Sequence, residues 1–69
     1  MTLLQNYSVE EGALIYGLAQ QAHYGDVQGE RPSVVNMEQY LMWGWWHEQR
    51  GKPREQALRE WLEFTVPIL

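Results

Sequence analysis

Three segments of the chain carry apolar residues at the spacing of an amphipathic helix. In the first segment, residues 8–24, the apolar residues Ala13, Leu14, Leu18 and Ala22 fall three or four positions apart. This period places them on one face of a helix, where they can pack against the rest of the protein. We therefore predict a first helix over residues 8–24.

Capping and turn residues mark both ends of this helix. Ser8 and Glu11 have the spacing of a capping box, in which each side chain bonds the backbone amide of the other residue. Gly25 follows the last apolar position and is expected at the left-handed C′ position. Gly12 and Gly17 each weaken the helix by roughly 1 kcal/mol relative to alanine. We interpret both as points where a neighbouring backbone comes close.

Two further helices are predicted over residues 36–50 and 53–66, after a loop at residues 25–35. Asn36 and Gln39 repeat the capping-box spacing at the start of the second helix. That helix is apolar around much of its circumference, which indicates packing on two sides. The sequence thus predicts an all-α protein, a small helical bundle that forms one domain over residues 1–69.

Arg50, Gly51 and Pro53 separate the second and third predicted helices. Arg50 complements the negative end of the second helix, and Gly51 supplies the turn. Pro53 suits the first position of the third helix, where its missing amide hydrogen costs nothing. The third helix then carries an apolar stripe of Leu58, Trp61, Leu62, Thr65 and Leu69.

Composition narrows the class of protein. The chain has 69 residues, of which 45% are apolar, and no cysteine. It is too apolar for a disordered segment and has no disulfide to stabilise it. No apolar run reaches the length of a membrane span, and no signal peptide pattern is present. We therefore expect a soluble protein of the cytoplasm.

Charge excludes one class of partner. The net charge is −4, and residues 1–30 contain four acidic residues but no lysine or arginine. A polyanionic nucleic acid is a poor partner for such a surface. His23 and His47 lack the spacing of a zinc site, and no catalytic triad or carboxylate pair stands out. We expect no metal, no cofactor and no enzymatic activity.

Two blocks of the sequence resemble the acyl-CoA-binding protein family. The first is YGLAQQAHYGDVQGERPS at residues 16–33, and the second is WGWWHEQRGKPREQA at residues 43–57. Members of that family carry Tyr-Gly-x-x-x-Gln-Ala-x-x-Gly-Asp-x-x-x-x-Arg-Pro, then Trp-x-x-Trp and a Lys/Arg-Gly turn. The resemblance implies a four-helix bundle. Only seven residues precede Ser8, so we expect three of the four helices.

The resemblance also implies a ligand site. Tyr16 and Trp61 match the family's tyrosine and its last-helix aromatic, which hold the nucleotide, and Trp43 matches a tryptophan that borders the acyl group. Gln20 and Met42 stand where the family has lysines that bind phosphate. Because charge-assisted hydrogen bonds are about twice as strong as neutral ones, we expect weak binding of acyl-CoA. Core packing is the alternative interpretation of Tyr16 and Trp61.

Three residues of the first block are interpreted as structural. Gly25, Asp26 and Arg31 match the family's loop, where local hydrogen bonds fix the chain more than they contact ligand. Trp45 stands where the family has a small residue, so its ring either fills space left by the missing helix or faces a partner.

Two functions from different classes remain open. The first is binding of an acyl-CoA thioester. The second is a non-catalytic subunit that uses an exposed helical groove to hold a second copy of itself or a larger protein. Monomers rarely leave a large apolar patch in water, so such a groove would be covered. The residues expected at this groove are Leu3, Leu4, Leu14 and Trp45.

Overall fold

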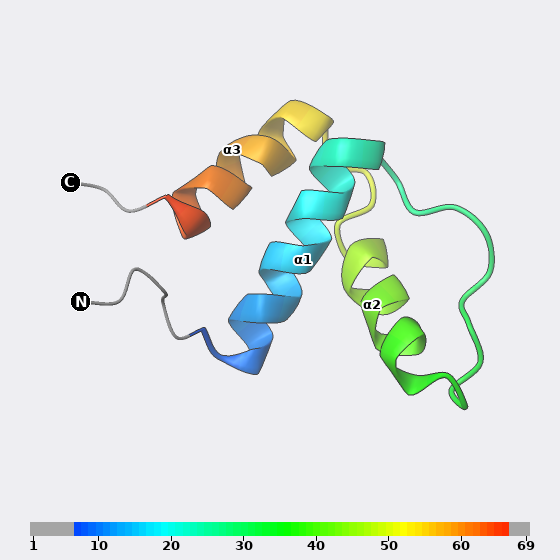
Figure 1. The fold of residues 1–69 in the computed structure, drawn as a ribbon. Helices are drawn as coiled ribbons and strands as arrows, with labels where there is room; N and C mark the ends of the chain where they lie inside the picture. The colour runs from blue at the N-terminus through cyan, green and yellow to red at the C-terminus, as the bar shows by residue number, and fades with distance from the viewer. Residues whose placement is uncertain (1–6, 67–69) are drawn as a thin grey trace.

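The computed structural model describes residues 7–66 and contains three helices (Figure 1). These are α1 (Val9–Tyr24), α2 (Met37–His47) and α3 (Arg54–Thr65). Between residues 7 and 66 there is no strand. The predicted all-α fold is therefore confirmed. The expected absence of a helix ahead of α1 concerns residues that include 1–6, which lie outside the described part of the chain.

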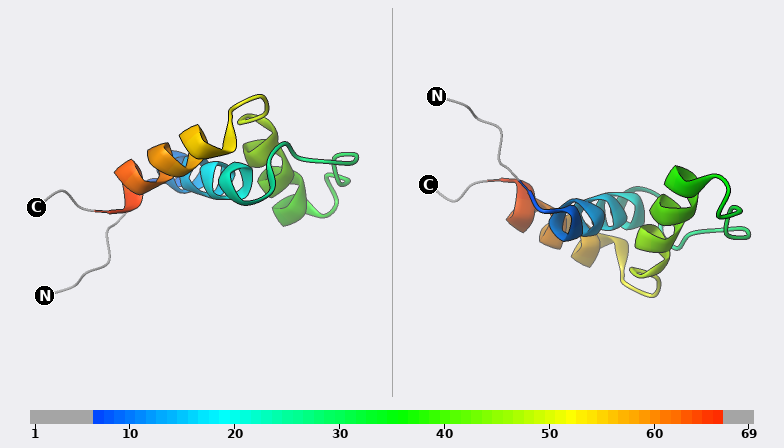
Figure 2. Two further views of the ribbon diagram at one scale, coloured as in Figure 1. Left: turned by 90° about the horizontal axis from the view of Figure 1, so that it is seen from above. Right: turned by 90° about the horizontal axis from the view of Figure 1, so that it is seen from below.

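The first helix lies between the other two. In Figure 1, α3 packs on one side of α1 and α2 on the other, and Figure 2 shows the same order from above and below. Contacts between helices join α1 to α3 and α1 to α2, whereas α2 and α3 do not contact each other within the described residues. The two outer helices are therefore held together through α1 and through the segments outside the helices, such as Tyr7, whose hydroxyl donates to the Phe64 carbonyl of α3 at 3.0 Å.

The most deeply buried side chains lie on α1 and α3. Leu18 and Ala57 are completely buried, and the polar Gln21 is 1% exposed. No residue of α2 is buried to this degree. The contact of α1 with α2 depends instead on Gly17, where a side chain would overlap the backbone carbonyl oxygen of Trp45. The predicted close approach is confirmed at Gly17 and wrong at Gly12, which has nothing within 4 Å of its would-be Cβ.

The start of α1 follows its local sequence. The backbone N–H of Glu11 donates to Ser8 Oγ at 3.1 Å, and the N–H of Ser8 donates to Glu11 Oε1 at 2.9 Å. The predicted capping box is confirmed. The helix ends at Tyr24 as predicted, but Gly25 has φ +83° and ψ −153° rather than left-handed helical angles. Essentially only glycine adopts this region, which turns the chain sharply into the loop.

Both predicted ends of α2 need correction. Asn36 makes no side-chain cap, and its backbone, with φ −95° and ψ 69°, lacks the extended angles typical of a capping residue. A turn precedes it, in which Ser33 Oγ accepts from the N–H of Val35 and the Ser33 carbonyl accepts from the N–H of Asn36. The helix stops at His47 instead of Arg50. The amides of Gln49, Arg50 and Lys52 then each donate to the third preceding carbonyl, which tightens the chain.

The start of α3 differs by one residue from the prediction. Pro53 occupies the cap position with an extended ψ of 143°, and the helix begins at Arg54. The proline still ends the preceding turn, since its fixed φ of −58° suits a helix entrance.

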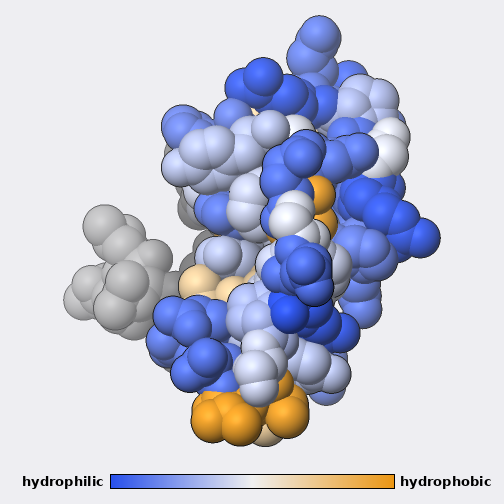
Figure 3. All heavy atoms as spheres, turned by 90° about the vertical axis from the view of Figure 1, so that its right-hand side faces the viewer, coloured by the Kyte–Doolittle hydropathy of each residue, from blue (hydrophilic) through white to orange (hydrophobic). Residues whose placement is uncertain are grey.

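The loop ahead of α2 is partly apolar on its surface. Figure 3 views this side of the molecule and shows an apolar patch at its lower end. Val34 and Val35, at the end of the loop, are 55% and 85% exposed, and Met37 at the start of α2 is 51% exposed.

Candidate functional site

A hollow of about 320 Å³ lies between α1 and α3. It is lined by Ala19, Ala22 and His23 from α1 and by Leu58 and Trp61 from α3. The alanines leave space that larger side chains would fill, and Trp61 contributes a half-buried ring. We call this the α1–α3 hollow. Its lining suits a flat, largely apolar group.

Arginine brings positive charge to the edge of this hollow. Arg54 lines a neighbouring shallow depression together with Ala22, Glu55 and Leu58, two of which also line or border the hollow. Its guanidinium donates to the carbonyl oxygens of Ala22 at 3.2 Å and His23 at 2.8 Å. Because guanidinium has five N–H donors, these two bonds leave others for an anion.

The predicted nucleotide-binding residues are divided between two sides of α1. Tyr16 packs its ring edge-on against Trp45 of α2, with centroids 6.1 Å apart and planes at 72°. Trp61 lines the α1–α3 hollow. Gln20, one turn after Tyr16, is half-buried on α1, and Met42 is half-buried on α2. The ligand roles of all four stay predictions.

Trp43 lies within a stack of flat groups. Its ring stacks on His47 with centroids 4.8 Å apart and planes at 15°. The guanidinium carbon of Arg31 is 5.9 Å from its centroid. The indole Nε1 is buried without a hydrogen-bond partner among the described residues. The role of Trp43 beside an acyl group remains a prediction.

Asp26 joins the end of α1 to the turn before α3. Its Oδ1 accepts from Gln21 Nε2 at 2.7 Å and from the backbone N–H of Gly51 at 2.8 Å. The hydrogen bond from Gln21, followed by that from Gly51, lowers the pKa of this carboxyl below its usual value. Gln21 Nε2 also donates to the Lys52 carbonyl at 2.9 Å. We call these four residues the Asp26 clasp.

Arg31 connects the long loop to α2. Its Nε donates to the Tyr40 carbonyl at 3.2 Å, and its guanidinium lies 3.7 Å from the centroid of the Tyr40 ring. A side chain at Gly44 would overlap this guanidinium. Arg31 therefore bonds another part of the chain, and so does Asp26.

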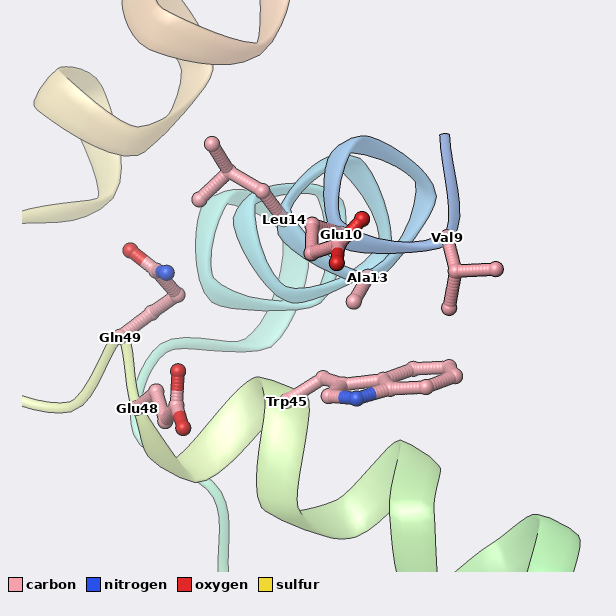
Figure 4. Close-up of a pocket in the computed structure, with 7 residues that line it drawn as sticks. All are labelled: Val9, Glu10, Ala13, Leu14, Trp45, Glu48 and Gln49. Atoms are coloured by element: carbon pink, nitrogen blue, oxygen red, sulfur yellow. The ribbon is translucent and has the colours of Figure 1, made fainter. Parts of the chain in front are cut away.

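A second hollow, of about 280 Å³, lies between the first half of α1 and the end of α2 (Figure 4). Leu14 and Trp45, both predicted to face a partner, line it together. Leu3 and Leu4 lie outside the described residues. We call this the α1–α2 hollow, and its lining is Val9, Glu10, Ala13, Leu14, Trp45, Glu48 and Gln49.

Comparison with known proteins identifies the family. The sequence model of the family described as "Acyl CoA binding protein" matches residues 1–65. The chain belongs to the acyl-CoA-binding protein family. The resemblance predicted from the two sequence blocks is confirmed.

Several members of this family are similar along nearly the whole chain. "Acyl-CoA-binding protein 2" of Saccharomyces pastorianus is 35% identical over 62 residues, which are 90% of this chain and 71% of that protein. "Acyl-CoA-binding protein" of Ricinus communis is 34% identical over 68 residues, or 99% of this chain and 76% of the relative. "Acyl-CoA-binding domain-containing protein 6" of Arabidopsis thaliana is 33% identical over 68 residues, which are 99% of this chain and 74% of that protein.

Two further findings bear on other classes of site in this family member. In the part of the chain that the structure describes, no group of three or more His, Cys, Asp or Glu could hold a metal ion. Among the described helices, none is long and apolar enough to cross a membrane.

Sequence reasoning missed Gln21, although it belongs to the quoted Gln-Ala motif. A signal was present, because Gln21 follows Leu14 and Leu18 at helical spacing and so lies on the same apolar stripe. A polar residue at such a position requires a buried partner. Arg54 was also missed. It stands in a charged segment with Arg50, Lys52 and Glu55, and nothing in that pattern indicates the α1 carbonyls that it bonds.

Proposed function

We propose that this chain binds an acyl-CoA thioester without transforming it. The observation that carries the proposal is the family match over residues 1–65, with relatives named for acyl-CoA binding along nearly the whole chain. No catalytic residue is assigned, because the proposed site consists of aromatic, apolar and hydrogen-bonding side chains.

The α1–α3 hollow is our candidate for the nucleotide. Trp61 offers a ring face on which an adenine can stack, and Ala19 and Ala22 leave room beside it. The predicted contact of Tyr16 with the nucleotide lies outside this hollow, because Tyr16 packs against Trp45 on the other side of α1. Trp43 borders the acyl group in this proposal. Arg54 at the edge of the hollow provides a positive charge for phosphate.

Phosphate is held weakly in this proposal. Gln20 donates only a neutral hydrogen bond, and Met42 has no donor at all. A hydrogen bond from a charged donor contributes about 1.5–3 kcal/mol, so each missing lysine costs about one to two powers of ten in affinity. The chain is therefore expected to bind acyl-CoA more weakly than a member with both lysines.

Isothermal titration with octanoyl-CoA and palmitoyl-CoA tests the proposal. We expect saturable binding of at least one thioester, and a loss of about tenfold or more in Trp61→Ala, since stacking on an aromatic ring contributes about 1–3 kcal/mol. Leu62→Ala is the matched control, because its side chain is 41% exposed on the same helix and does not line the hollow. Absence of binding at millimolar thioester would refute the proposal, and equal effects of both variants would refute the role of Trp61.

A second candidate function is that of a non-catalytic interaction subunit. It is favoured by one observation, the apolar part of the α1–α2 hollow, which Val9, Ala13, Leu14 and Trp45 line. Light scattering during gel filtration at low micromolar concentration tests whether a second copy covers this surface. A folded species with a mass of 8.2 kDa at every concentration would exclude that occupant.

A further inference from the structure

The α1–α2 hollow combines three features that do not belong to a phosphate site. Its lining beside the Trp45 ring is apolar, from Val9 and Ala13, whereas Leu14 lines the hollow but points away from that ring (Figure 4). Its edge carries two carboxylates, Glu10 from α1 and Glu48 from the end of α2. Carboxylates repel the phosphates of coenzyme A, so this hollow and the proposed acyl-CoA site are chemically distinct.

The charge around the hollow is negative without local compensation. Between residues 7 and 66, Glu10 and Glu48 make no ion pair, and no lysine or arginine lines the hollow. Most of the basic side chains are engaged elsewhere: Arg31 with Tyr40, Arg50 with His47, Lys52 with Glu60 and Arg54 with α1 carbonyls. Glu48 also lies at the negative end of the α2 dipole, which adds to the field.

We infer that this hollow binds an arginine side chain presented by a basic segment of a partner protein. The methylene stem would lie on the apolar lining from Val9 and Ala13, and the guanidinium would lie at the Trp45 ring, within the field of the two carboxylates. Guanidinium suits this place better than ammonium, because it stacks on aromatic faces and bonds carboxylates through a planar fork of donors. The volume, about 280 Å³, is at the lower limit for a small-molecule site and adequate for one long side chain.

The inference deepens the second candidate function and is independent of acyl-CoA binding. It specifies which group of the partner protein is bound, namely a positively charged group at the end of an apolar side chain. Its test must therefore separate the loss of the charge contact from the loss of all protein binding.

The probe is a capped pentapeptide with arginine between two leucines, titrated against the ¹⁵N-labelled protein at low salt. The comparison peptide carries citrulline, which has nearly the same shape and no charge. We expect the indole N–H signal of Trp45 to shift with the arginine peptide. We also expect that peptide to bind about two- to fivefold more tightly than the citrulline peptide, because an ion pair with an exposed carboxylate contributes up to about 1 kcal/mol.

Glu10→Gln combined with Glu48→Gln should abolish this preference. Both residues are exposed, so the fold is expected to survive, which circular dichroism checks. Glu55→Gln combined with Glu63→Gln is the control of equal charge on α3 and should keep the preference. In the protein without substitutions, added salt should weaken binding of the arginine peptide more than binding of the citrulline peptide.

Equal affinities for the two peptides, or a preference that survives Glu10→Gln with Glu48→Gln, would overturn the arginine site while leaving protein binding open. Failure of both peptides to bind at millimolar concentration would overturn the arginine site and remove support for the interaction function at this hollow. Neither result bears on acyl-CoA binding, which titration with the thioesters decides.

Discussion

The indole N–H of Trp46 donates a hydrogen bond of 2.8 Å to the carbonyl oxygen of Gly25. The bond joins α2 to the residue at which α1 ends, 21 positions earlier in the chain. The Trp46 ring also lies beside Tyr24, with centroids 5.7 Å apart. One side chain therefore fixes the end of α1, the start of the loop and the position of α2.

Trp46→Phe should lower the free energy of unfolding by about 0.5–1.5 kcal/mol, because it removes this part-buried hydrogen bond from the Gly25 carbonyl. Urea unfolding followed by circular dichroism measures the change. Trp43→Phe is the matched control: its Nε1 is buried without a partner among the described residues, so no hydrogen bond is lost. Equal destabilisation by the two variants would show that the Trp46 bond contributes nothing.

Gly17 and Gly12 should respond in opposite directions to alanine. At Gly17 a methyl group would overlap the Trp45 carbonyl, so Gly17→Ala should destabilise the protein by about 1–3 kcal/mol through overpacking. At Gly12 nothing lies within 4 Å, so Gly12→Ala should stabilise it by up to about 1 kcal/mol through helix propensity. Thermal unfolding of both variants checks the contrast. A stabilised Gly17→Ala would mean that α1 and α2 are further apart than described.

Asp26 makes stability depend on pH at the acidic end. Its folded-state pKa lies below the ordinary value of 3.8, chiefly through the hydrogen bonds from Gln21 and Gly51. The stabilisation is therefore fully present above the unfolded-state pKa and is lost as pH falls through the lower folded-state pKa. In Asp26→Asn the stability should fall less between about pH 7 and about pH 2. Urea unfolding at both values measures this. Glu63→Gln is the control, since Glu63 makes no hydrogen bond within residues 7–66, and an unchanged pH dependence in Asp26→Asn would contradict the prediction.

Restoring two lysines should strengthen acyl-CoA binding. Gln20→Lys with Met42→Lys adds two charge-assisted donors, and we expect the dissociation constant for palmitoyl-CoA to fall by about tenfold or more. Titration calorimetry measures it. Gln28→Lys with Val35→Lys adds the same charge on exposed loop residues and should have a small, salt-sensitive effect. Tight binding by the unchanged protein that neither pair alters would show that Gln20 and Met42 do not mark a weakened phosphate site.

Local rules predicted the parts of the fold that local contacts determine. The start of α1 depends on Ser8 and Glu11, which are three residues apart and bond each other as expected. The end of α2 could not be predicted in this way, because the turn after His47 is held by Gln21 and Asp26 from a distant part of the chain. The same capping-box spacing at Asn36 gave no cap, because the turn that precedes α2 leaves Asn36 with a ψ of 69° instead of an extended backbone.

The candidate site was predicted by resemblance more than by pattern. Tyr16, Trp43 and Trp61 were selected because they match family positions, and periodicity alone would have assigned them to the core. Tyr16 and Trp61 lie on two sides of α1, and this could not be predicted. It depends on the positions that α2 and α3 take around the axis of α1. The pairing of Glu10 with Glu48 at one hollow was invisible for the same reason.

The central position of α1 has a consequence for amide hydrogen exchange. Since α2 and α3 do not contact each other, α2 can detach while the completely buried Leu18 and Ala57, on α1 and α3, keep their surroundings. Local opening of this kind follows contiguous units of structure. The amides of α2 should then exchange through a smaller opening than those at the centre of α1, whose protection reports the unfolding of the whole domain.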